Sequence, residues 1–138
     1  AASAGDLRRA RALAAALPDD TSDYMHCSAA FRGELADWFA LRGPHLRAVE
    51  LGAYRGATTL VLSYVFAHVL AIDVNATLLR ATRARTRGRG NVALLLADTA
   101  REAWWQDPRT QGAEVLLVDA SHEYEDARRD LHNGLARL

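Results

Sequence analysis

Short apolar runs alternate with longer amphipathic stretches from about residue 47 onward. Such alternation is typical of a parallel sheet whose strands are joined by crossover helices. The pattern predicts four strands, at residues 47–51, 68–72, 92–97 and 114–118. It predicts helices at residues 57–66, 76–87, 99–105 and 123–138. The part of the chain from residue 46 to residue 138 is therefore expected to be an α/β domain.

Two further helices are predicted before the first strand, which gives an N-terminal helical segment over residues 1–45. The first covers residues 6–17, with Asp6 as its cap and Pro18 as its stop. A loop over residues 18–26 leads to the second, over residues 28–41. Its apolar residues recur at helical spacing: Phe31, Leu35, Trp38 and Phe39. The expected fold is a Rossmann-like three-layer α/β sandwich with these helices added in front.

The ends of the predicted strands carry the candidate chemistry. Asp73, Asp98 and Asp119 each follow a strand, and a glycine turn beginning at Gly52 follows the first one. In open α/β sheets, ligands bind beyond the carboxyl ends of the strands. A single aspartate there is more often a turn former or a helix cap. Three of them along one edge favour a ligand site.

The glycine turn has the spacing Gly-x-x-x-Gly, formed by Gly52 and Gly56. Dinucleotide-binding domains have Gly-x-Gly-x-x-Gly instead, which gathers backbone amides around a pyrophosphate. Here Glu50 lies just before the turn, which suits a ligand that carries an ammonium group or a positively charged sulfur. An ordinary strand-to-helix turn with a buried Glu50 is the alternative for these residues alone.

The acids on the next two strands indicate a nucleoside ligand. Asp73 lies about 20 residues after Gly52, the separation at which an acid on the second strand accepts ribose hydroxyl groups. Both NAD and S-adenosylmethionine contain that ribose, so Asp73 does not distinguish them. Asp98 is placed to bind an adenine amino group or to cap the helix predicted over residues 99–105. Trp104 follows closely and could wall the adenine side.

The composition argues against several classes of binding partner. The 17 basic and 17 acidic residues cancel, so no overall field attracts nucleic acid or a membrane surface. The arginines of residues 80–89 close a predicted helix and lack interleaved aromatic residues, which favours a solvated face. The single cysteine, Cys27, excludes an internal disulfide and suits a cytoplasmic location. The alanine- and arginine-rich start weakly resembles a transit peptide.

Four segments in order carry a family resemblance: 50–59, 71–73, 97–99 and 117–125. With these segments the chain resembles class I S-adenosylmethionine-dependent methyltransferases. The likeness is greatest to the small-molecule O-methyltransferase branch, in which Asp-x-x-His-x-Tyr-Glu follows the fourth strand. The resemblance covers residues 48–131 and implies a sheet of order 3-2-1-4. The family has three more strands, numbers 5 to 7, for which no segment is found here.

The resemblance also implies roles for individual residues. The residues implied in cofactor binding are Glu50, Gly52, Ala53, Tyr54, Gly56, Thr58, Asp73, Val74, Asp98, Thr99 and Asp119. His122 would be the general base near the acceptor hydroxyl, because histidine titrates near neutral pH. In metal-dependent members the residue matching Asp119 binds magnesium, with further ligands on the strands not found here.

We therefore expect the methyl-donor half of a methyltransferase acting on a small-molecule hydroxyl group. An NAD-dependent oxidoreductase remains an alternative, disfavoured by the missing third glycine and by Glu50. A non-catalytic nucleotide-binding or interaction module is the other alternative, made plausible by the missing strands. The sequence indicates neither the acceptor nor whether the chain forms a homo-oligomer.

Overall fold

A four-stranded parallel sheet forms the centre of the computed structural model, which describes residues 4–17, 27–136 and 138. Its strands are β1 (Arg47–Leu51), β2 (His68–Asp73), β3 (Val92–Leu96) and β4 (Val115–Val118). They lie in the order β3-β2-β1-β4, and every neighbouring pair is parallel. The predicted α/β class and the strand order 3-2-1-4 are therefore confirmed.

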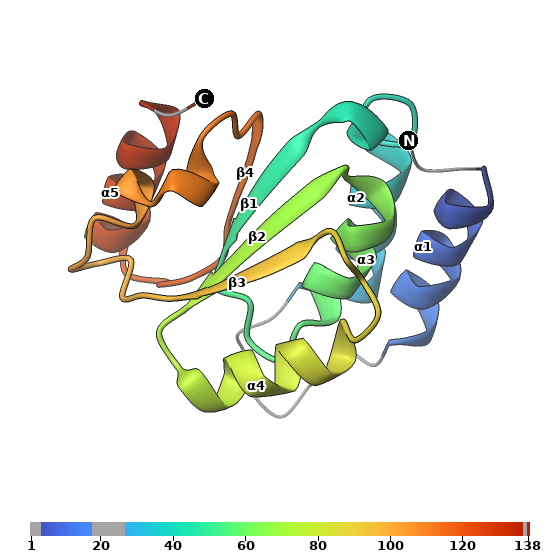
Figure 1. The fold of residues 1–138 in the computed structure, drawn as a ribbon, viewed down its shortest axis with the longest axis horizontal. Helices are drawn as coiled ribbons and strands as arrows, with labels where there is room; N and C mark the ends of the chain where they lie inside the picture. The colour runs from blue at the N-terminus through green and yellow to red at the C-terminus, as the bar shows by residue number, and fades with distance from the viewer. Residues whose placement is uncertain (1–3, 18–26, 137) are drawn as a thin grey trace.

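Helices cover both faces of this sheet and complete the three layers (Figure 1). One face carries α1 (Ala4–Ala16), α2 (Ala29–Trp38), α3 (Ala57–Val65) and α4 (Ala76–Arg85). The other face carries α5 (Tyr124–Leu135). Short 3-10 helices are η1 (Gly43–His45), η2 (Trp104–Gln106) and η3 (Pro108–Thr110).

The alternation of side chains along β1 divides the interior into two cores. Ala48 joins a cluster with Val61 and Val65 of α3, whereas Val49 and Leu51 join a second cluster that contains Trp104. Both sets are buried, as expected for a parallel sheet with helices on each face. The site at the end of β1 is therefore fixed by packing from two sides.

The N-terminal helices belong to the first of these cores. Ala10 and Ala14 of α1 and Ala36 of α2 are almost fully buried in the same cluster as Val61. Small side chains at these positions let the helix axes approach closely. Arg32 of α2 is buried as well, and its guanidinium donates hydrogen bonds to the carbonyl groups of Leu17 and Cys27.

Helix α2 differs from its prediction in length and orientation. It ends at Trp38 rather than at residue 41, and Trp38 is 81% exposed. Phe31 is also exposed, while the buried positions of the helix are Arg32 and Ala36. The inward face is thus built from small residues and one arginine, which an apolar periodicity dominated by aromatic residues does not reveal.

The segment predicted as a helix over residues 99–105 is a turn followed by η2. Asp98 accepts a hydrogen bond from the amide of Ala100, and its own amide donates to Glu102. These local bonds satisfy the backbone without a helix. The other predicted elements from β1 to β4 agree with the structure to within two residues, and the last helix ends at Leu135. The predicted loop over residues 18–26 lies outside the described residues.

Within the part of the chain that the structure describes, no helix is both long and apolar enough to cross a membrane.

Candidate cofactor-binding site

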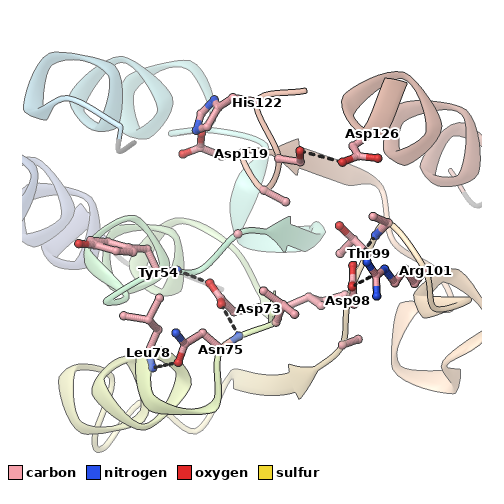
Figure 2. Close-up of a pocket in the computed structure, with 17 residues that line it drawn as sticks. Tyr54, Asp73, Asn75, Leu78, Asp98, Thr99, Arg101, Asp119, His122 and Asp126 are labelled. Atoms are coloured by element: carbon pink, nitrogen blue, oxygen red, sulfur yellow. Dashed lines mark hydrogen bonds and ion pairs between the residues drawn. The ribbon is translucent and has the colours of Figure 1, made fainter. Parts of the chain in front are cut away.

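A cavity of about 770 Å³ opens at the carboxyl ends of all four strands (Figure 2). Residues that follow each strand contribute to its wall, and α4 and α5 add one residue each. The lining residues are Gly52, Tyr54, Ile72, Asp73, Val74, Asn75, Leu78, Ala97, Asp98, Thr99, Ala100, Arg101, Asp119, Ala120, Ser121, His122 and Asp126. This is the position at which open α/β sheets bind ligands, and the volume suits a nucleoside-sized molecule.

The turn after β1 depends on two glycines in left-handed backbone conformations. Gly52 has φ +89°, and a Cβ there would lie 2.1 Å from the carbonyl oxygen of Asp119. Gly56 has φ +77°, and a Cβ there would lie 2.7 Å from Cγ2 of Thr82. Gly52 therefore lets the end of β4 close against the turn. Gly56 lets α3 start against α4, and it does not line the cavity.

Asp73 is anchored in the cavity wall through both of its carboxylate oxygens. Its Oδ2 accepts a hydrogen bond from the amide of Tyr54 at 2.8 Å, and its Oδ1 accepts one from the amide of Asn75 at 2.8 Å. Figure 2 shows this carboxylate held between the two turns. Each carboxylate oxygen has a second lone pair, so the pair of oxygens stays able to accept two ligand hydroxyl groups.

The segment after β3 forms the wall nearest to Asp98. The Asp98 carboxylate accepts from the amide of Ala100 at 3.0 Å and pairs with Arg101 at 3.5 Å. Thr99 is buried, and its hydroxyl donates to Asp130 of α5 at 2.9 Å. Trp104 also donates to Asp130, at 3.3 Å, and lies in the hydrophobic core instead of along the cavity.

Glu50 lies behind the cavity and does not line it. It is 1% exposed, and it accepts a hydrogen bond of 2.5 Å from the hydroxyl of Thr59 on α3. Burial raises the pKa of Glu50 to about 8; the Thr59 hydrogen bond opposes this, and the charges of Asp119 and Asp73 add to it. Glu50 is therefore largely protonated at neutral pH in the ligand-free protein.

Asp119 shares its carboxylate with a thiol. Sγ of Cys27 donates to Oδ2 of Asp119 at 3.1 Å, and Thr58 is also hydrogen-bonded to this thiol. Burial, together with Asp119, raises the pKa of Cys27 to about 12, while Thr58 acts in the opposite direction. No sequence pattern indicates this contact, because Cys27 and Asp119 lie far apart along the chain.

The magnesium site implied by the resemblance does not fit these residues. Among residues 4–17, 27–136 and 138, no group of three or more His, Cys, Asp or Glu side chains is placed to hold a metal ion. Magnesium prefers octahedral coordination by oxygen atoms. Asp119 offers one carboxylate, already hydrogen-bonded to Cys27. Asp119 is therefore a carboxylate of the cavity wall and not a magnesium ligand in this arrangement.

The segment after β4 supplies the remaining wall. His122 is exposed to solvent and borders the cavity, as do Ser121 and Asp126. The hydroxyl of Ser121 donates to Asp126 at 3.0 Å, which ties this segment to the first turn of α5. The imidazole of His122 is thus at the open side, where a second molecule could reach it.

Most of the residues expected to bind a cofactor meet at this cavity. Those that line it are Gly52, Tyr54, Asp73, Val74, Asp98, Thr99 and Asp119, together with the expected base His122. Those behind it are Glu50, Ala53, Gly56 and Thr58. Nine lining residues were not predicted from the sequence: Ile72, Asn75, Leu78, Ala97, Ala100, Arg101, Ala120, Ser121 and Asp126. Asn75 had a signal, because it caps α4 through the amides of Thr77 and Leu78.

The balance of charge in the cavity is negative. Four carboxylates line it, from Asp73, Asp98, Asp119 and Asp126, against one arginine and one histidine. The arginine, Arg101, is paired with Asp98. Such a wall attracts a cationic or hydroxyl-rich ligand and repels phosphate groups.

Comparison with known proteins agrees with this geometry. A family model described as a methyltransferase domain matches residues 49–138, which is more than half of the chain. No curated protein matches the sequence.

Three solved structures share the fold. A precorrin-6y C5,15-methyltransferase from Geobacter metallireducens superposes with a TM-score of 0.69 at 16% identity, over 91% of this chain and 66% of that protein. An N-methyltransferase from Bradyrhizobium japonicum, solved with S-adenosyl-L-homocysteine, superposes with a TM-score of 0.67 at 15% identity. The match covers 96% of this chain and 67% of that protein. An amino pentose methyltransferase from Micromonospora echinaspora, solved with S-adenosylmethionine, superposes with a TM-score of 0.57 at 23% identity. The match covers 76% of this chain and 44% of that protein. The present chain thus spans between 44% and 67% of the length of these proteins.

A parallel sheet of order β3-β2-β1-β4, with carboxylates gathered at the ends of its strands, defines a Rossmann-like domain. The chain belongs to the methyltransferase domain family, and its fold is that of class I S-adenosylmethionine-dependent methyltransferases. The resemblance seen in the sequence is confirmed at this level, while the O-methyltransferase branch stays a prediction.

Proposed function

We propose that this chain binds S-adenosylmethionine in the cavity and forms the methyl-donor part of an enzyme that methylates a hydroxyl group of a small molecule. The observation that carries the proposal is the arrangement of Asp73, Asp98 and Asp119 around one cavity in a methyltransferase-domain fold. Two of the structural neighbours were solved with this cofactor or its demethylated product, which supports the choice of ligand.

The charge of the cavity favours this cofactor over NAD. S-adenosylmethionine carries a positive sulfur and an ammonium group and has no phosphate, so it suits a wall with four carboxylates. NAD would bring a diphosphate to the same wall, where Arg101 is already paired with Asp98. Under the proposal, Asp73 accepts the ribose hydroxyl groups, and the segment from Asp98 to Arg101 flanks the adenine.

The acceptor would approach from the side of His122. When bound, S-adenosylmethionine supplies a methyl group on a positively charged sulfur. The cavity wall aligns donor and acceptor, which is the main source of rate in an in-line displacement. Under the proposal, the imidazole of His122, which borders the cavity, takes up the proton that a hydroxyl group must lose. Asp119 and Asp126 keep that side of the cavity suited to neutral or cationic acceptors.

Calorimetric titration of the purified chain with S-adenosylmethionine, S-adenosyl-L-homocysteine and NAD tests the cofactor assignment. We expect the first two to bind and NAD not to bind. Asp73→Asn should weaken both by about 10- to 100-fold, because a hydrogen bond to a charged group is lost. Asp37→Asn is the control, since Asp37 lies on α2 and pairs with Arg11 away from the cavity.

A folded chain that binds neither nucleoside would contradict the proposal. So would NAD binding with an affinity equal to that of S-adenosylmethionine. Circular dichroism of Asp73→Asn must accompany the titration, because Asp73 also holds the amides of Tyr54 and Asn75. Asp98→Asn is a second variant for the same titration. It should disturb the turn after β2 less than Asp73→Asn does, because Asp98 accepts its backbone hydrogen bond from Ala100.

A further inference from the structure

Asp130 is a carboxylate that α5 buries completely, at 0% exposure. Its two oxygen atoms accept hydrogen bonds from the hydroxyl of Thr99 and from the indole nitrogen of Trp104. Burial of a carboxylate against uncharged donors costs free energy that an apolar residue would not cost. Both of its hydrogen bonds go to one segment, the stretch that follows β3.

That segment is a wall of the cavity. Residues 98–101 all line it, and Thr99 is the one that Asp130 holds. The neighbouring Arg129 donates to the carbonyl group of Ala100 at 2.7 Å. Two consecutive residues of α5 therefore hold two consecutive residues of the wall. The segment has only turn structure of its own, so its position depends on these contacts.

The same face of α5 also holds a second wall, the segment after β4. Asp126 lies one helical turn before Asp130, on the same side of the helix. It accepts from the hydroxyl of Ser121, in the segment after β4, and pairs with Arg129. Figure 2 shows Asp126 on the same side of the cavity as Thr99, near the segment after β4.

The topology shows how far this connection extends across the sheet. Strands β3 and β4 are the two edges of the sheet, with β2 and β1 between them. Three strand spacings separate the edges, roughly 14 Å. Helix α5 follows β4 in the chain, yet it bonds the segment after β3. It therefore spans the carboxyl edge and joins both walls of the cavity.

We propose that Asp130 is a positioning residue for cofactor binding, which acts through Thr99 to hold the adenine-side wall of the cavity in place. This inference rests on the proposed function, because it assumes that the cavity takes S-adenosylmethionine and its product. It predicts that ligand affinity depends on a residue that does not itself line the cavity.

Titration of S-adenosyl-L-homocysteine into Asp130→Leu, Thr99→Val and the double variant tests this role. We expect each single variant to weaken binding about tenfold, as for the loss of one hydrogen bond to a charged group. The double variant should bind no more weakly than Asp130→Leu, because that change already removes the contact between Asp130 and Thr99. Asp130→Asn keeps one oxygen acceptor and should recover part of the affinity.

Thr86→Val is the matched control. Thr86 is a buried threonine that caps the C-terminal end of α4, and its hydroxyl donates to the carbonyl group of Thr82. Its replacement should lower the free energy of unfolding and leave the affinity within about twofold of native. A role of Asp130 in stability alone would give the same pattern as Thr86→Val.

The outcomes separate the two proposals. Unchanged affinity in folded Asp130→Leu and Thr99→Val would overturn the positioning role, and so would losses that add in the double variant. Thr99→Val guards against failure to fold, since it removes only the hydroxyl that reaches Asp130. If the native chain bound no S-adenosyl-L-homocysteine, the proposed function would fall, and this inference with it.

Discussion

Glu50 shows how the sheet decides the environment of a single side chain. It alternates with Val49 and Leu51, so it shares the face of β1 that Ala48 presents to α3. The sequence places an acid before the glycine turn but does not say which face it occupies. Both faces of a parallel strand are buried, so the apolar pattern carries no sign of direction. The hydrogen bond to Thr59 settles that the carboxyl group points to α3.

Burial of Glu50 predicts a stability that falls as the pH rises. Its pKa is about 8 in the folded chain and 4.5 in the unfolded reference, so the folded state binds the extra proton between these values. The stabilisation is fully present below pH 4.5 and is lost as the pH passes through 8. Linkage gives a slope of about 1.4 kcal/mol per pH unit for one such group. Urea unfolding at several pH values measures it.

Glu50→Gln is the matched variant for this measurement. The amide has the same shape, keeps an oxygen for the hydroxyl of Thr59 and does not ionise in this range. The free energy of unfolding of Glu50→Gln should therefore depend less on pH than that of the native chain. The difference in slope should equal the contribution of one titrating group. The nearby groups Asp73, Asp119 and Cys27 remain in both proteins, so the difference isolates Glu50. Parallel stability curves for the two proteins would contradict the assignment.

The strands, and the acids at their carboxyl ends, were predicted well from the sequence. The acids at Asp73, Asp98 and Asp119 line the cavity, because parallel strands bring their carboxyl ends to one edge. Contacts from distant elements could not be predicted in the same way. The hydrogen bonds between Thr99 and Asp130 and between Cys27 and Asp119 depend on how the helices pack across the sheet.

Helix α2 illustrates the same limit from the opposite direction. Its aromatic residues follow helical spacing, yet Ala36 and Arg32 face the core. Periodicity identifies a helix from its larger apolar residues. Which face of the helix packs against the core depends on the size of the side chains on neighbouring helices. Ala36 fits because α1 also presents alanines, at Ala10 and Ala14, to the same cluster.

The turn between β1 and α3 should be intolerant of a side chain at its first position. In Gly52→Ala the new Cβ would lie 2.1 Å from the backbone oxygen of Asp119, in a left-handed backbone conformation. We expect a loss of more than about 2 kcal/mol in the free energy of unfolding. Denaturant unfolding gives this value, and ligand titration of any folded fraction should show weakened binding.

Gly33→Ala is the control for that substitution. Gly33 lies inside α2, and a Cβ there meets no atom within 4 Å. Alanine in a helix interior should raise the free energy of unfolding by about 0.5–1 kcal/mol. Equal effects of the two changes would mean that Gly52 is not held against the end of β4.

At the scale of the whole molecule, the N-terminal helices and the sheet share one interior. The cluster beneath α3 combines Ala10 and Ala14 of α1 with Ala36 of α2 and Val69 of β2. The sequence suggested a helical segment over residues 1–45 beside an α/β domain over residues 46–138. Composition gives such a boundary, but it does not reveal that alanines on both helices fill the surface of α3.

This shared core predicts that the chain unfolds as one cooperative unit. Ala14→Leu overfills the contact between α1 and α3, where Ala14 is 1% exposed, and should cost about 1–3 kcal/mol. Ala15→Leu, on the exposed side of α1, should cost little. Urea unfolding is followed by far-ultraviolet circular dichroism and by the fluorescence of Trp104 and Trp105, which belong to the same cluster, in a Trp38→Phe background. Both signals should move together to a lower midpoint in Ala14→Leu. If the helices formed a separate unit, only the dichroism would shift, because Trp104 and Trp105 report the core on the opposite face of the sheet.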